Sequence, residues 1–393
     1  MKVAILHPDL GIGGAERLIV DVAVGLESKG HDVTLVTNHY DRSHCFEETK
    51  SLNIIRFAMF PRTIFGLMWA LCAYVRMCFA ALYTCLFVEH DVVIVDQVSA
   101  CLLVFRLFSK APLIFYCHYP DLLLTKRESR LKSFYRYYLD SLEEYSTGKA
   151  DIICVNSKFT AGVFRETFKS LKDKPVQVLY PSLNNKFFDE IPVEKVDCIP
   201  NRAKFVFTSL NRYEIKKNVG LAIEAFALFI SKVNPDDSHL IIAGGFDKLN
   251  SENSECYKDL VDLSERLEIP SKCITFLKSP DDNVKVNVIR NSTAVLYTPS
   301  NEHFGIVPVE AMYLGVPVIA VKSGGPLETV NHGVSGYLAE NNPEDFLRFM
   351  ELLAENSNTE FKKKGPEWVR KNFSFQSFTE KLDHIVCSRL SSQ

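Results

Sequence analysis

Two carboxylates and a short glycine-containing run lie close together in residues 301–321. Glu302 and Glu310 are eight residues apart, with Phe304-Gly-Ile-Val307 between them. An apolar, strand-like stretch and a Pro-Ser turn precede this run, so the pattern predicts a helix N-terminus near residue 305. Such a terminus offers unpaired N–H groups and partial positive charge, which suit a diphosphate. Glu310 follows about two turns later on roughly the same face, where its carboxylate can accept hydrogen bonds from sugar hydroxyls.

Two cations stand in a second loop that leads into a predicted helix. Arg212 and Lys217 are five residues apart, just before the apolar run 219–230. Cations beside a helix N-terminus are well suited to a diphosphate. The plainer alternatives are a surface charge cluster for this pair and a helix cap for Glu302. A third loop, Ser323-Gly-Gly-Pro-Leu-Glu328, is expected to pack beneath the same site.

The amino-terminal part of the chain predicts a βαβ unit. A buried strand over 3–6 leads into Gly11-Ile-Gly-Gly14, a helix over 15–28 and a strand over 31–37. This opening indicates a parallel sheet with a ligand at the carboxyl ends of its strands. The loop lacks the GxGxxG dinucleotide pattern, and no acidic residue ends the second strand, so a nicotinamide enzyme is disfavoured. A tight turn without a ligand is the alternative interpretation of the glycines.

His118 begins a loop at the carboxyl end of a strand predicted over 113–117. Loops in this position commonly carry the site in open α/β sheets. A neutral imidazole there can donate a hydrogen bond to a sugar hydroxyl, and a purely structural histidine is the alternative.

Residues 64–88 form an apolar segment that contains one charge, Arg76. Its length would allow it to cross a bilayer. Strands expected before and after it should share one sheet, however, and a single crossing would put them on opposite sides of a membrane. A helical patch lying in the membrane interface is therefore favoured, while a buried crossover helix and a true span remain open. The basic, aromatic run 126–136 fits either an anionic headgroup surface or an ordinary solvated face.

Composition and length limit the remaining possibilities. The 393 residues predict two or three domains, and a net charge of -3 gives no support to nucleic-acid binding. The eleven cysteines form no CxxC pair, which favours reduced thiols and a cytosolic setting. We expect an amino-terminal domain over 1–200, a second α/β domain over 201–367 and closing helices over 368–393.

The motifs resemble those of a known enzyme family. Glu302 and Glu310, with Phe304-Gly305 between them, resemble the signature of retaining glycosyltransferases of family 4, which have the GT-B fold. Residues 7–16, 116–125 and 301–308 make the chain resemble, over nearly its whole length, the alpha-1,3/1,6-mannosyltransferases that extend the dolichol-linked precursor of asparagine-linked glycosylation.

The resemblance implies an α/β protein of two Rossmann-like domains facing a cleft, with a C-terminal helix that crosses back to the first domain. It implies transfer of an alpha-1,3 and then an alpha-1,6 mannose from GDP-mannose to Man1GlcNAc2-diphosphate-dolichol. Glu302 and His118 would position the mannose and Glu310 the ribose. The diphosphate would be bound by the cations and amides of the two loops, namely Arg212, Lys217, Phe304, Gly305, Ile306 and Val307, with Gly13 and Gly14 facing the donor or the acceptor.

The same resemblance implies a location on the cytosolic face of the endoplasmic reticulum membrane. The partners it implies are the donor, the dolichyl-diphosphate-linked oligosaccharide, the membrane surface and other early mannosyltransferases of the pathway. No cofactor and no obligatory metal are expected, since no DxD pair stands where a metal-bound diphosphate would need it. Two alternatives remain: a family-4 transferase with another nucleotide sugar or a soluble acceptor, and a catalytically silent GT-B scaffold.

Overall fold

The computed structural model describes the chain except residues 65–67, 126–129, 357–358 and 389–393. The described chain divides into two compact units, residues 1–182 with 375–393, and residues 183–374. The second unit therefore begins earlier than the boundary expected at residue 200. The physical reason is that residues 184–194 are bound to it: Tyr313 donates to the Asp189 carboxylate at 2.8 Å, and Arg290 donates to the Phe188 carbonyl at 2.7 Å.

The first unit contains a seven-stranded parallel sheet with the order β3-β2-β1-β4-β5-β6-β7. Chain order reverses direction between β1 and β4, which makes the carboxyl ends of these two strands the expected ligand position. The strands are β1 (Lys2–His7), β2 (Asp32–Thr37), β3 (Asn53–Arg56), β4 (Val92–Asp96), β5 (Leu113–Cys117), β6 (Ile152–Val155) and β7 (Val176–Val178).

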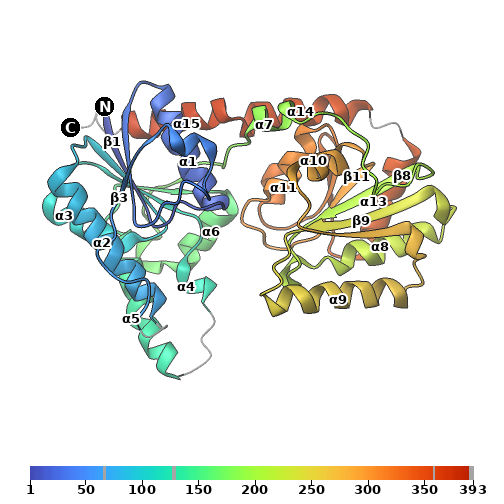
Figure 1. The fold of residues 1–393 in the computed structure, drawn as a ribbon, viewed down its shortest axis with the longest axis horizontal. Helices are drawn as coiled ribbons and strands as arrows, with labels where there is room; N and C mark the ends of the chain where they lie inside the picture. The colour runs from blue at the N-terminus through green and yellow to red at the C-terminus, as the bar shows by residue number, and fades with distance from the viewer. Residues whose placement is uncertain (65–67, 126–129, 357–358, 389–393) are drawn as a thin grey trace. The chain divides into compact units, whose positions relative to one another are not determined.

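Helices cover both faces of this sheet, as Figure 1 shows. Along β1, Val3 and Ile5 face the core shared with α1 and α15, while Ala4 and Leu6 face the core shared with α2, α3, α5 and α6. This alternation is the two-residue period of a strand that is buried on both sides. The helices are α1 (Gly14–Ser28), α2 (Trp69–Phe87), α3 (Leu102–Phe108), α4 (Asp121–Leu124), α5 (Arg130–Thr147), α6 (Lys158–Thr167) and α15 (Phe375–Ser388).

The apolar segment predicted over 64–88 contains helix α2, and residues 65–67 lie outside the described part. By length and composition, α2 could cross a membrane. One side of it, including Cys72, Met77 and Ala80, is buried against the sheet. Trp69 and Phe87 are 64% and 72% exposed, which excludes a fully buried crossover helix. The helix is thus a half-buried crossover between β3 and β4.

The second unit is built on a six-stranded sheet with the order β10-β9-β8-β11-β12-β13. All neighbouring strands are parallel, and chain order reverses between β8 and β11. The strands are β8 (Phe205–Leu210), β9 (Ser238–Gly244), β10 (Ile274–Lys278), β11 (Ala294–Tyr297), β12 (Val318–Val321) and β13 (Gly336–Ala339). The helices are α7 (Asn185–Glu190), α8 (Gly220–Ile230), α9 (Ser251–Arg266), α10 (Asp282–Arg290), α11 (Ile306–Tyr313), α12 (Pro326–Thr329), α13 (Pro343–Glu355) and α14 (Thr359–Phe373).

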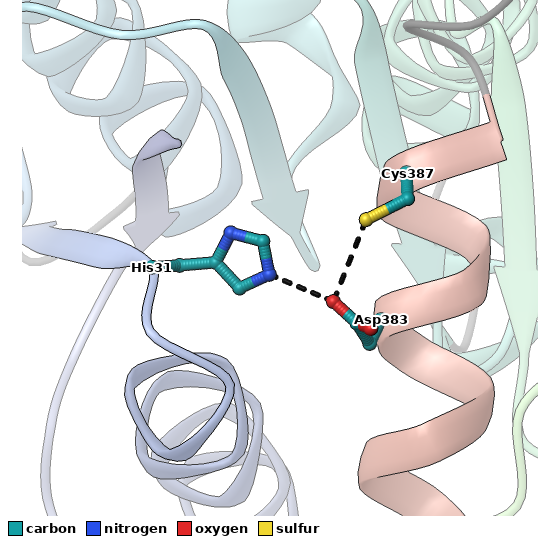
Figure 2. A group of neighbouring side chains, drawn as sticks. All are labelled: His31, Asp383 and Cys387. Atoms are coloured by element: carbon teal, nitrogen blue, oxygen red, sulfur yellow. Dashed lines mark hydrogen bonds and ion pairs between the residues drawn. The ribbon is translucent and has the colours of Figure 1, made fainter.

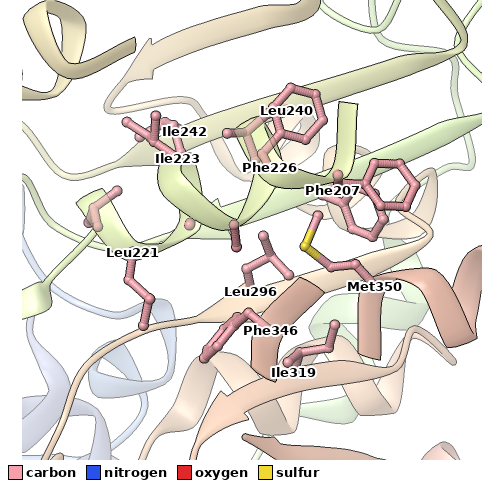
Figure 3. Packing of buried hydrophobic residues seen from close by; sticks show 14 of the residues in the cluster. Phe207, Leu221, Ile223, Phe226, Leu240, Ile242, Leu296, Ile319, Phe346 and Met350 are labelled. Carbon is pink, nitrogen blue, oxygen red and sulfur yellow. The ribbon is translucent and has the colours of Figure 1, made fainter. Parts of the chain in front are cut away.

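One face of the second sheet holds an aromatic-rich core (Figure 3). Phe207 of β8 packs edge-to-face on Phe229 of α8 at 5.0 Å, and Phe226 and Phe346 are completely buried beside them. Large apolar side chains dominate the burial of such a layer. This core fixes the position of the sheet. The loops that contain Lys217 and Glu302 extend from the carboxyl ends of its strands.

The closing helices divide between the two units. Helix α14 belongs to the second unit, whereas α15 packs against α1 in the first, which confirms the expected return of the last helix. His31, which precedes β2, holds α15 through its Nε2 atom, 2.7 Å from Asp383 Oδ1 (Figure 2). Cys387, one turn further along α15, donates to the same oxygen at 3.5 Å.

Phe226→Ala should destabilise the second unit strongly, because it opens a cavity in a fully buried layer. We expect the free energy of unfolding, measured by urea denaturation, to fall by about 3–5 kcal/mol. Leu249→Ala is the matched control, since Leu249 is 95% exposed and its loss should change stability by less than about 0.5 kcal/mol. Equal losses for the two variants would contradict the proposed importance of this core.

Candidate active site

The loops that follow β8 and β11 meet at the switch point of the second sheet. Lys217 ends the 3₁₀ turn Ile215–Lys217 after β8, and Glu302 lies in the loop after β11. Lys217 Nζ donates to Glu302 Oε2 at 2.5 Å. Thr298 Oγ1 donates to the Lys217 carbonyl at 2.8 Å, so the lysine loop is fixed by the start of the glutamate loop. Parallel strands explain why two loops far apart in sequence converge here.

The ion pair sets the protonation state of Glu302. Burial alone would raise the pKa of this carboxyl, but attraction and hydrogen bonding, mainly from Lys217 and also from His303, leave the pKa below its usual value. Glu302 is therefore ionised at neutral pH. A fixed, partly buried carboxylate of this kind can bind sugar hydroxyls or stabilise developing positive charge.

The Glu302 loop is held by backbone contacts that leave no room for side chains. The Gly325 N–H donates to the Glu302 carbonyl at 2.7 Å, and a Cβ on Gly325 would lie 2.3 Å from the Phe304 oxygen. Gly305 precedes α11 with a φ of +84°, a left-handed conformation that favours glycine. The loop 323–328 therefore packs against the candidate site as expected, and α11 begins at Ile306, which confirms the predicted helix start.

Glu310 is paired with a residue that the sequence did not single out. Lys285 on α10 places its Nζ 2.8 Å from each Glu310 carboxylate oxygen. Burial raises the pKa of Glu310, and the lysine only partly offsets this effect. A ribose bound to Glu310 would have to share or displace Lys285. No motif marks this lysine, because its approach depends on where the fold places α10 relative to α11.

Arg212 lies at the open side of the same loop. Its side chain is 72% exposed, and Nη1 is 3.8 Å from Glu214 Oε1. The backbone of Asn211, the residue before it, lies directly against the end of β9, since a Cβ on Gly244 would lie 1.7 Å from the Asn211 oxygen. Arg212 thus projects from a rigid loop while its guanidinium stays accessible to an anion.

In the first unit, three polar residues meet at the switch point of the sheet. His7 ends β1, Asp96 ends β4 and His118 follows β5. Asp96 is completely buried, with Oδ2 2.8 Å from His7 Nδ1 and Oδ1 2.9 Å from His118 Nε2. Burial would raise the pKa of Asp96, but the two imidazoles lower it to about 2. Burial opposes protonation of His118, yet Asp96 raises its pKa above the ordinary value.

The glycine loop after β1 leads into the N-terminus of α1. Gly13 precedes the helix in an extended conformation, and Gly14 is its first residue. The Glu16 carboxylate folds back over Gly13, where an added Cβ would lie 2.2 Å from Glu16 Oε2. An anion at these amides would therefore meet a resident carboxylate, whereas a hydroxyl-bearing acceptor could use it as a hydrogen-bond acceptor.

The structure brings some predicted residues together and gives others new partners. Lys217 contacts Glu302 directly, Glu310 pairs with Lys285, and His118 belongs to a histidine–aspartate cluster in the other unit. Phe304 packs edge-to-face on Phe373 at 5.6 Å, so its side chain is structural. His7 and Asp96 were not predicted as site residues. His7 directly follows the strand predicted over 3–6, at the edge where ligands bind, and that position was an available signal.

A possible metal-binding group lies outside this site. Within the described residues, His31, Asp383 and Cys387 form the only such group. None of the residues predicted to bind the donor takes part in it.

Both units match family models, and the whole fold matches solved glycosyltransferases. Residues 12–186 match "Glycosyltransferase Family 4", and residues 195–368 match "Glycosyl transferases group 1". Sucrose-phosphate synthase from Thermosynechococcus elongatus superposes with a TM-score of 0.77 at 17% identity, covering 100% of both chains. Fold and family models together define a GT-B glycosyltransferase, confirming the predicted fold class.

The sequence relatives are more specific. The alpha-1,3/1,6-mannosyltransferase ALG2 of Homo sapiens is 48% identical over 99% of this chain and 96% of its own length. The protein of the same name from Dictyostelium discoideum is 41% identical over 98% of both chains. The chain belongs to the ALG2 family of alpha-1,3/1,6-mannosyltransferases, which confirms the resemblance and the predicted enzyme class.

Lys217→Met should destabilise the protein at neutral pH, because Glu302 would stay ionised without its partner. We expect the free energy of unfolding at pH 7 to fall by about 1–3 kcal/mol. The loss should shrink as the pH falls through the carboxyl range. In the wild type, Glu302 has a lowered pKa, and its contribution to stability is lost as the pH falls through that pKa. In Lys217→Met, the Glu302 carboxyl has no lysine partner and is protonated readily, which relieves the cost of its buried charge. Urea denaturation between pH 7 and pH 4 measures both effects.

Lys216→Met provides the matched control for this substitution. Lys216 is 73% exposed and pairs with Glu214 at 3.1 Å, so its loss should change stability little at any pH. A pH-independent loss in Lys217→Met would contradict the assigned ion pair.

Proposed function

We propose that the chain transfers mannose from GDP-mannose to a lipid-diphosphate-linked short glycan, first in an alpha-1,3 and then in an alpha-1,6 linkage. The acceptor is Man1GlcNAc2-diphosphate-dolichol, on the cytosolic face of the endoplasmic reticulum membrane. The observation that carries the proposal is the Lys217–Glu302 pair beside the start of α11, in a member of this mannosyltransferase family. One such site serves both transfers.

The second unit binds the donor. Glu310 accepts hydrogen bonds from the ribose hydroxyls, with Lys285 moving aside or bridging to the nucleotide. Arg212, Lys217 and the amides of residues 304–307 bind the diphosphate. Charge stabilisation on the departing diphosphate is the main catalytic effect that these groups provide.

The transfer breaks the bond between the mannose C1 and the diphosphate oxygen and forms a bond from C1 to an acceptor hydroxyl oxygen on the same face. The acceptor proton passes to the leaving diphosphate, which balances the charge. Glu302 and His118 position the mannose, and Gly13 and Gly14 border the acceptor or the donor. The cationic side chains and amides provide the charge that a metal would otherwise supply, so no obligatory metal is required.

The acceptor's lipid requires a membrane-facing surface on the first unit. Helices α2, α3, α4 and α5 carry exposed apolar side chains and lie along one flank of this unit (Figure 1). Among the exposed residues are Trp69, Phe87, Leu107, Phe108, Leu123, Leu124 and Phe134. Partly embedded aromatic and aliphatic side chains are typical of proteins that bind the membrane interface. Residues 126–129 of the basic run lie outside the described residues.

The direct test is transfer of labelled mannose from GDP-mannose to a synthetic lipid-diphosphate-chitobiose-mannose acceptor, with and without a chelator. We expect two added mannoses under both conditions. Arg212→Ala should lower kcat by about 10²–10³-fold through lost charge stabilisation. Lys216→Met, whose lysine lies in the same loop but pairs with Glu214, should keep wild-type activity.

Other outcomes of this assay have distinct meanings. Loss of activity with chelator would overturn the metal-free mechanism. Transfer from another nucleotide sugar, or to a water-soluble glycan, would replace the proposed substrates. Nucleotide binding with no transfer to any acceptor would indicate a silent scaffold.

Replacing Leu107 and Phe108 together by glutamate should weaken membrane binding, since it puts two charges into the apolar flank. We expect the fraction that floats with phosphatidylcholine–phosphatidylinositol vesicles to fall severalfold. Leu249→Glu, a change at an exposed apolar residue of the second unit, should float like the wild type. Equal flotation of all three proteins would exclude this flank as the membrane contact.

A further inference from the structure

The loop that begins with His118 is held at both ends by side chains from outside it. Asn156 Nδ2 donates to the His118 carbonyl at 3.1 Å. At the other end, Glu143 of α5 accepts two backbone hydrogen bonds, from Asp121 N at 2.8 Å and from Leu122 N at 3.2 Å. Glu143 uses one carboxylate oxygen for each amide, so both oxygens are needed to hold the first turn of α4.

Glu143 is buried among groups that do not neutralise it. Arg136, the nearby cation, is shared between Asp121 Oδ2 and Asp140 Oδ1, at 2.9 Å from each. The other titratable groups that face Glu143 are Tyr74 of α2 and Cys117 of β5. Burial raises the pKa of Glu143 to about 7, with Asp121 and Asp140 adding to the increase and the two backbone donors opposing it. Its protonation state therefore changes in the physiological range.

We propose that Glu143 is a positioning residue for mannosyl transfer, whose ionised form holds residues 118–122 in place and whose protonation loosens this loop. The proposal rests on the proposed role of His118. A protonated carboxyl retains one good acceptor oxygen and loses its charge, so one of the two amide bonds is weakened. Activity then falls as the pH drops through neutrality.

Protonation of Glu143 should lower activity but raise the stability of the fold. Because its pKa is raised on folding, Glu143 binds a proton more readily in the folded chain than in the unfolded chain. Its ionisation therefore costs stability as the pH rises from about 4.5 toward 7. A residue needed only for folding would lose activity and stability together. A positioning carboxylate loses activity at low pH while the fold gains stability.

Glu143→Gln tests the proposal, because glutamine resembles the protonated acid at every pH. For the wild type, we expect kcat for mannosyl transfer to rise to a plateau with an apparent pKa near 7. The variant should show a flat profile, about tenfold below that plateau. Its melting temperature at pH 8 should equal or exceed that of the wild type. Glu144→Gln is the matched control, because Glu144 is the next residue of α5 and binds Ser170 instead, so the wild-type profile should persist.

Hydrogen exchange separates this proposal from the proposed function. After correction for intrinsic rates, the amides of Asp121 and Leu122 should gain protection above pH 7 in the wild type and not in Glu143→Gln. If the protein transferred no mannose but showed this exchange pattern, the proposed function would fail. The control of residues 118–122 by the protonation of Glu143 would still stand. If Glu143→Gln kept the wild-type pH dependence of both exchange and transfer, or lost stability at pH 8, the proposal would be overturned.

Discussion

The candidate site in the second unit depends on backbone contacts that exclude any Cβ atom. A Cβ on Gly324 would lie 2.5 Å from the Glu302 oxygen, and Gly325 approaches Phe304 as closely. Gly244 presses in the same way on the backbone before Arg212. Protein interiors are packed too tightly to absorb such overlaps, so these glycines fix where the charged side chains begin. The backbone positions from which the Glu302 and Arg212 side chains extend are therefore fixed by these contacts.

Burial raises the pKa of Asp96, Glu302 and Glu310, and the attraction from neighbouring groups, set against the depth of burial, decides the final direction. Asp96 has two imidazoles and ends with a pKa of about 2, and Glu302 has one lysine and ends below its usual value. Glu310 also has a lysine but is buried more deeply, and its pKa stays raised. The structure thus separates a carboxylate that is ionised at neutral pH, Glu302, from one that needs a hydroxyl or a cation beside it, Glu310.

Much of the fold was predictable, because its strands are apolar runs buried on both faces and bounded by turns. The strand at 113–117 was predicted with the bounds that the structure shows, whereas β13 was not predicted, because Gly336–Ala339 is only four residues long and begins with a glycine. The position at the carboxyl end of a strand also pointed to His118, whereas Lys217 and Glu302 were predicted from their places beside helix N-termini. Sequence could not reveal that Lys285 reaches Glu310, since that contact depends on where the tertiary fold places two different helices, α10 and α11.

The ion pairs already present in the second unit affect how an anionic donor would bind. Lys217 is already neutralised by Glu302, so a diphosphate arriving there would compete with a carboxylate for the same ammonium group. Arg212 is 72% exposed and its nearest carboxylate oxygen is 3.8 Å away, so most of its charge remains available. Initial attraction should therefore come from Arg212 and the start of α11. Lys217 would turn toward the diphosphate once sugar hydroxyls engage Glu302, because that carboxylate then has other donors. Sugar recognition and diphosphate binding would in this way reinforce each other.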